Sequence, residues 1–67
     1  MPGRITVLFT AFVTVVEVRD ASGMLIGSYR FNSREEGNDY ARFLAQQPRY
    51  KGFKLELSRS DNLVPRL

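Results

Sequence analysis

A run of alternating apolar residues near the amino terminus is the feature that most constrains the fold. The odd positions from Ile5 to Val15 are all apolar, whereas the even positions alternate threonine with larger apolar residues. Valine and threonine favour strands, and a period of two is the pattern of a strand. We therefore expect one strand over residues 4–19, with a bulge or bend inside it because it exceeds the usual strand length. Its second face is half apolar, which predicts a central place in the sheet.

The residues that follow predict a turn and a second strand. Asp20-Ala21-Ser22-Gly23 combines side chains that bond to neighbouring backbone with a glycine that tolerates positive φ. A short loop of this kind between two apolar runs predicts a hairpin. The second strand is expected over residues 24–32, and Gly27 in its middle favours a bulge or a close backbone approach.

A capping box marks the start of a helix. Ser33 and Glu36 have the spacing of a capping box: the Ser33 hydroxyl can accept a hydrogen bond from the Glu36 backbone N–H, and the Glu36 side chain can return a hydrogen bond to Ser33. The helix is expected over residues 34–47, and Pro48 should end it because proline forces the preceding residue out of helical geometry. Its core-facing stripe consists of Gly37, Tyr40, Ala41 and Leu44, with Phe43 beside it.

A last strand is expected over residues 53–58, where Phe53, Leu55 and Leu57 alternate with polar residues. Pairing this strand beside the first one keeps the most apolar strand in the middle. The predicted fold is therefore α+β, in the order β-β-α-β, with a three-stranded antiparallel sheet of order 2-1-3 and one helix packed on one face. We expect a single domain over residues 1–67, with an ordered core over about 4–58 and a tail over 59–67.

The residue types that are missing exclude several kinds of chemistry. The 67 residues include no cysteine and no histidine, so disulfides, thiolate metal sites and the commonest general base are ruled out. The acidic residues are scattered, and those at the helix start fit capping. We therefore expect no enzyme, no cofactor and no metal. The lack of cysteine fits a reducing compartment, and the expected location is the cytoplasm, without a membrane partner.

Two groups of surface residues are candidate partner contacts. The helix leaves one face of the expected sheet open, and Leu8, Phe12 and Val16 form an apolar row there. Exposed apolar patches with a polar border often mark interaction sites, as do free strand edges. Basic residues with interleaved aromatics follow the helix. The predicted partner-binding residues are Leu8, Phe12, Arg30, Arg49, Lys51, Lys54 and Arg59.

These surfaces predict a small protein-binding module, an inhibitor or regulator, that acts through its open sheet face or edge. The hairpin–helix–strand layout is similar to that of several small phage-encoded inhibitors of host enzymes, and this resemblance implies a protein target. The small core favours a homodimer. One alternative is a basic nucleic-acid-binding domain, since the net charge is +3 and Phe12 with Arg30 could stack on bases. The other is a self-assembling structural subunit.

Overall fold

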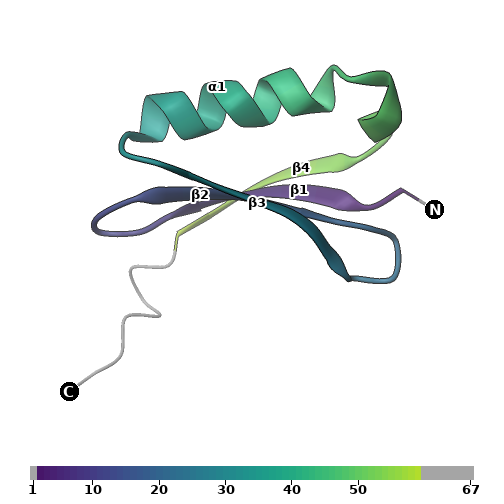
Figure 1. Ribbon diagram of the computed structural model, residues 1–67, viewed down its shortest axis with the longest axis horizontal. Coiled ribbons are helices and arrows are strands. Elements are labelled where there is room, and N and C mark those ends of the chain that lie inside the picture. Colours follow the sequence, from purple (N-terminus) through teal and green to yellow (C-terminus); the bar gives the residue numbers. More distant parts are fainter. Residues whose placement is uncertain (1, 60–67) are drawn as a thin grey trace.

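The computed structural model describes residues 2–59, and this part of the chain forms one mixed sheet with a helix along one face (Figure 1). Across the sheet the strand order is β3-β2-β1-β4. Neighbouring strands are antiparallel except for β4, which runs parallel to β1. The elements in chain order are β1 (Arg4–Phe9), β2 (Thr14–Arg19), β3 (Leu25–Phe31), the helix α1 (Arg34–Ala45), the 3-10 turn η1 (Pro48–Tyr50) and β4 (Lys54–Arg59).

The predicted α+β class and its single helix are confirmed for the described residues, whereas the predicted three-stranded antiparallel sheet is wrong. Residues 4–19 form two strands, so the bend expected there is a complete reversal. This extra reversal leaves β3 parallel to β1, and a helical crossover then returns the chain for a parallel strand. The last strand does lie beside the first one, but it is parallel to it. The layout that resembled the phage inhibitors is therefore not the observed one.

The reversal lies between Phe9 and Thr14, which are directly paired. Thr10 donates its backbone N–H to the Val13 carbonyl at 3.0 Å, which closes the turn over residues 10–13. This segment contains none of the glycine, proline, asparagine or aspartate residues that usually mark turns. The alternating pattern runs through it without interruption, which is why the sequence predicted one strand.

The position of the turn decides which residues of β2 enter the core. Directly paired residues share a face, so the even-numbered residues of β2 join the odd-numbered residues of β1. Val16 is therefore fully buried, although the pattern placed it on the open face. Val13 and Val15, which belong to the fully apolar face of the alternating pattern, are only partly buried. The buried apolar core consists of Ile5, Val7, Val16, Val18, Ala41 and Leu44.

Helix α1 begins with the predicted cap. The Glu36 backbone N–H donates to the Ser33 hydroxyl oxygen at 3.1 Å, and that hydroxyl lies 3.4 Å from the Glu36 carboxylate. The helix ends at Ala45 rather than at residue 47, and Pro48 begins η1. The predicted stripe faces the sheet, but Phe43 beside it is 54% exposed.

Gly37 brings the start of α1 close to the sheet. A Cβ atom at this position would lie 2.3 Å from the Thr14 Cγ2 atom, well inside van der Waals contact. Thr14 is itself buried, so its methyl group has little room to move. The absence of a side chain at Gly37 is therefore what allows this approach.

Three aromatic rings fill the space between α1 and β3. The Tyr40 ring lies 4.9 Å from that of Tyr29 and 5.2 Å from that of Phe31, between ring centroids. Burial raises the pKa of Tyr40, and the neighbouring Tyr29 adds to this rise. These rings lie among the partly buried residues that extend the core, as their spacing predicted.

The second hairpin is held by an aspartate turn. The Asp20 carboxylate accepts hydrogen bonds from the Ser22 hydroxyl at 2.6 Å and from the backbone N–H groups of Ser22 and Met24. Gly23 has a φ of 92°, a conformation that favours glycine. The predicted irregularity near Gly27 is present, since the pairing of β2 with β3 shifts register there.

Replacing Gly37 by alanine tests the close approach of α1 to the sheet. Overpacking costs about 1–3 kcal/mol and alanine gains about 1 kcal/mol of helix propensity, so we expect a net loss of up to about 2 kcal/mol in the free energy of unfolding. Serine at Thr14 removes the clashing methyl group. The double variant Gly37→Ala/Thr14→Ser should therefore recover part of the loss in denaturant unfolding. Additive effects of the two substitutions would contradict this contact.

The Asp20 turn predicts a dependence of stability on pH. Hydrogen bonds from the Ser22 hydroxyl, and then from the Met24 N–H, lower the pKa of Asp20 below its ordinary value of 3.8. A lowered pKa in the folded state stabilises the fold above pH 3.8, and this contribution is lost as the pH falls through the folded pKa. NMR titration of the carboxyl carbon should show the low pKa. In Asp20→Asn, which cannot titrate there, the unfolding free energy should fall less over the same acid range. A pKa at or above 3.8 would contradict the prediction.

Candidate functional site

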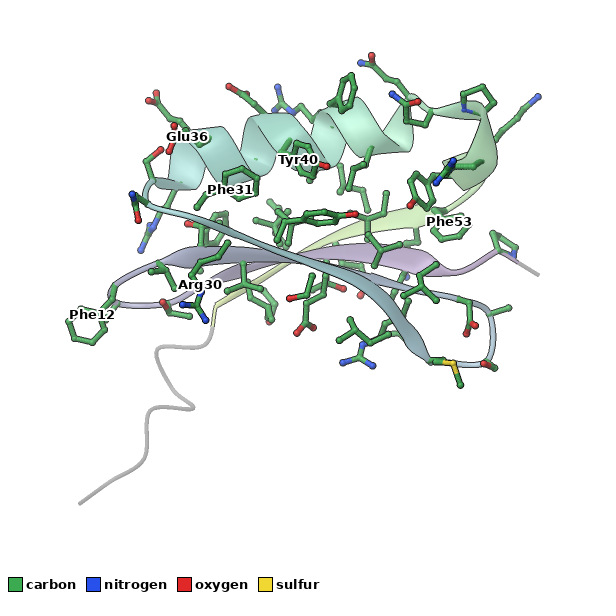
Figure 2. The ribbon with its side chains drawn as sticks, in the orientation of Figure 1. Phe12, Arg30, Phe31, Glu36, Tyr40 and Phe53 are labelled. Atoms are coloured by element: carbon green, nitrogen blue, oxygen red, sulfur yellow. The ribbon has the colours of Figure 1, made fainter. Side chains whose placement is uncertain are left out.

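The tip of the β1–β2 hairpin presents one large aromatic side chain to solvent. Phe12 is 90% exposed, the highest fraction among the large apolar residues of the described chain. Figure 2 shows its ring at the end of the molecule, projecting away from the sheet and from α1. Burying a large apolar side chain is favourable relative to leaving it in water. A phenylalanine that is exposed to this extent is therefore a candidate contact residue.

Thr10 holds this tip in one conformation. Its hydroxyl oxygen accepts hydrogen bonds from the backbone N–H groups of Phe12 at 3.2 Å and of Val13 at 2.9 Å. The same hydroxyl donates to the Val13 carbonyl. The threonine side chain thereby satisfies the backbone groups of a turn that has no glycine, a role that threonine hydroxyls can fill in turns.

Polar side chains from the start of α1 lie beside the tip. A shallow depression of about 250 Å³ separates the hairpin turn from the chain that enters the helix, and Asn32 and Arg34 line its helical side. The Arg34 guanidinium also lies 5.2 Å from the centre of the Phe9 ring, in cation–π geometry. The hairpin-tip site is defined here as Phe12 with Thr10, Asn32 and Arg34. It combines an apolar projection with an adjacent polar hollow.

The sheet face opposite α1 carries charged pairs rather than an apolar patch. The Glu56 carboxylate lies 3.6 Å from both the Arg4 guanidinium and the Lys54 ammonium. On β2, Arg19 and Glu17 lie 3.5 Å apart. These pairs are partly or largely exposed to solvent, so each contributes little to stability. The face is a surface of mixed charge.

The predicted apolar row on this face does not exist. Leu8 does lie there, half-buried and opposite Val15. Phe12 does not lie on this face because it belongs to the turn, and Val16 is buried on the helical side. Arg30 is exposed across from Val15. The rings of the strand residues, which are Phe9, Tyr29 and Phe31, pack against the core under α1.

The predicted basic residues are divided among several places. Arg49 and Lys51 lie after α1, at the end of the molecule away from Phe12, and the Arg49 guanidinium lies 5.9 Å from the Tyr50 ring centre. Lys54 is on the mixed-charge face. The backbone of Arg59 pairs with Phe9, while its side chain lies outside the described residues. The structure does not bring the seven predicted residues into one site.

Edge strand β4 is a second exposed feature, and the sequence pattern assigned its two leucines to the face that the helix covers. Leu55 and Leu57 face the helical side of the sheet, yet they are 40% and 63% exposed. Helix α1 packs mainly on β1 and β2 and least on β4. Alternation shows that two leucines share a face, but it does not show that their strand lies at the edge of the sheet.

The described residues offer few groups for other chemistry. No three histidine, cysteine, aspartate or glutamate side chains gather within residues 2–59 in a way that could hold a metal ion. No helix in the described part of the chain has the length and hydrophobicity needed to cross a membrane.

Comparison with known proteins gives no relative for this chain: no family model, curated protein or solved structure matches it.

Replacing Thr10 by valine tests whether its hydroxyl organises the tip. Valine keeps the shape of the side chain but leaves two backbone N–H groups without their acceptor, so we expect a loss of about 1 kcal/mol in the free energy of unfolding. Thr6→Val is the matched control, since it makes the same change on the open face of β1. Equal unfolding free energies for the two variants in denaturant would contradict the proposed role of Thr10.

Proposed function

We propose that this chain is a non-enzymatic protein-binding module whose contact point is the hairpin-tip site. The observation that carries the proposal is the 90% exposure of Phe12 on a turn that is fixed by hydrogen bonds. Aromatic residues are enriched among the side chains that dominate binding energies, and they act by filling a pocket of the partner. A side chain that projects from the end of the molecule is well placed to enter such a pocket.

The order of the turn supports this assignment. Ordering a flexible loop makes binding less favourable, and a turn that is already ordered avoids much of this cost. Thr10 provides this order through its contacts with the backbone of Phe12 and Val13. Asn32 and Arg34 supply polar groups beside the ring, which resembles the polar rim around the apolar centre of many interfaces. A role as inhibitor or regulator of the bound protein belongs to the same proposal.

Nucleic-acid binding is the less well supported alternative. Proteins that bind single strands on a sheet stack bases on exposed aromatic rings. The strand rings of the described sheet lie under α1, and Arg4, Arg19 and Lys54 on the open face each lie within 4 Å of a carboxylate. Phe12 lies in the hairpin turn rather than on the sheet face that carries Arg30, which is less favourable for a shared stacking platform.

Partner capture with a matched pair of variants tests the function. Phe12→Ala should leave the free energy of unfolding within about 0.5 kcal/mol of that of the original chain, since the ring is solvent-exposed. The same variant should weaken binding to a captured protein by roughly 30-fold, the effect expected of a dominant interface residue. Phe43→Ala, at another exposed phenylalanine, should leave binding unchanged.

The measurement is capture from a cell extract, followed by calorimetric titration of the purified partner with each variant. Partners that bind Phe12→Ala as tightly as the original chain would contradict the proposal. Fluorescence titration of a labelled single-stranded oligonucleotide at low and high salt covers the alternative. Binding that weakens steeply with salt and survives Phe12→Ala would assign the function to the basic residues instead.

A further inference from the structure

The outer edge of β4 has free backbone groups within the described part of the chain. Strand β4 pairs on one side with β1, and no other described strand pairs with it. The Lys54 N–H donates to the Gly3 carbonyl at 3.1 Å, so the backbone of Lys54 points toward β1. Backbone groups alternate in direction along a strand, and those of Leu55 and Leu57 therefore point outward. An edge of this kind is a template for pairing with another strand.

The side chains beside this edge are also incompletely covered. Leu57 is 63% exposed and Leu55 is 40% exposed, both on the helical side of the sheet. Strands that pair in parallel usually have both faces covered. The free edge and the exposed apolar side chains lie on the same strand. A single added strand would therefore pair the free backbone groups and cover the exposed leucines.

We propose that the strand added at this edge is β4 of a second copy of the chain, antiparallel and centred on Leu55. In this register Leu55 faces Leu55 of the second copy, and Leu57 faces Phe53. On the other side of the sheet Lys54 faces Glu56 of the second copy. The two-fold symmetry gives a second such pair, in which Glu56 faces Lys54 of the second copy. This pairing is separate from the hairpin-tip site.

Charge favours this register over the two neighbouring ones that the backbone allows. Outward-pointing residues must pair with outward-pointing residues, so the register can shift only in steps that keep Leu55 opposite an odd-numbered residue. One such step places Lys54 opposite Lys54, and the step in the other direction places Glu56 opposite Glu56. Like charges that face each other destabilise a sheet, whereas opposite charges stabilise it. The register centred on Leu55 pairs every Lys54 with a Glu56.

The geometry of the ladder favours the same contact. Residues that do not exchange hydrogen bonds across an antiparallel pair lie closer together, at a Cα separation of about 4.5 Å. Lys54 and Glu56 point their backbone inward, so they form such a close pair. Both helices would lie on the same face of the joined sheet. They would not collide, because each α1 packs mainly on β1 and β2 and the two β4 strands lie between them.

Reversal of the two charges tests the pairing and its register. Sedimentation velocity over a concentration series should show a dimer of the original chain. Lys54→Glu and Glu56→Lys should each raise the dissociation constant by roughly tenfold, since each places two like-charged contacts across the pair. The double variant Lys54→Glu/Glu56→Lys restores the opposite charges, and it should return the constant to within about threefold of the original value.

Arg30→Glu is the matched control, because it makes the same charge change at an exposed strand residue of β3, at the opposite edge of the sheet. It should leave the dissociation constant unchanged, and circular dichroism should show the same fold for every variant. A monomer at all concentrations would overturn the proposal and leave the edge to a different occupant. A dimer that persists in both single variants, or that the double variant fails to restore, would also overturn it. Phe12→Ala should have no effect on the dimer, which separates this proposal from the proposed function.

Discussion

The reversal of the chain between Phe9 and Thr14 is the constraint on which the rest of the structure depends. It converts one apolar run into two strands, and its length decides which side chains of β2 meet the helix. A turn shorter or longer by one residue would place Thr14 and Val16 on the solvent face, because a shift of one residue exchanges the two faces of a strand. The reversal also makes β3 parallel to β1, so the strand after the helix completes the sheet as a parallel neighbour. The Thr10 hydroxyl stabilises this reversal through its hydrogen bonds. A single side chain therefore supports the turn that determines the core, the topology and the position of Phe12.

Sequence reasoning recovered the features that are local. The Ser33 cap, the stripe from Gly37 to Leu44 and the turn at Asp20 depend on residues a few positions apart, and their patterns are specific. The first turn was missed although it is equally local. Its signal is a threonine hydroxyl followed by Ala-Phe-Val, and these residue types are also those of a strand interior. The sequence predicted a bend in this run but not its position, and the face of every residue in β2 followed from that position.

The candidate site was harder to predict, for a related reason. Phe12 was identified as a contact residue from its place in an alternating pattern, and it is exposed for another reason, namely that it lies at the apex of a turn. Leu57 was assigned to the core by alternation, and it is exposed because the helix crosses the sheet away from β4. Alternation reports which residues share a face. Whether that face is covered at a given strand depends on the position of the strand in the sheet, and this position is set by contacts between distant parts of the chain.

The parallel pair of β1 and β4 also sets the order in which the sheet can form. Arg4 pairs with Lys54, 50 positions later, whereas β1, β2 and β3 are joined by short turns. Short loops close with less loss of chain entropy and close faster than long ones. The pairings of the three-stranded meander can therefore form before the long-range pairing of β1 with β4, and β1 then has an open edge until β4 arrives. A strand added to this edge of β1 before that point would occupy the place of β4, so the edge stays exposed for as long as the long-range pairing takes to form.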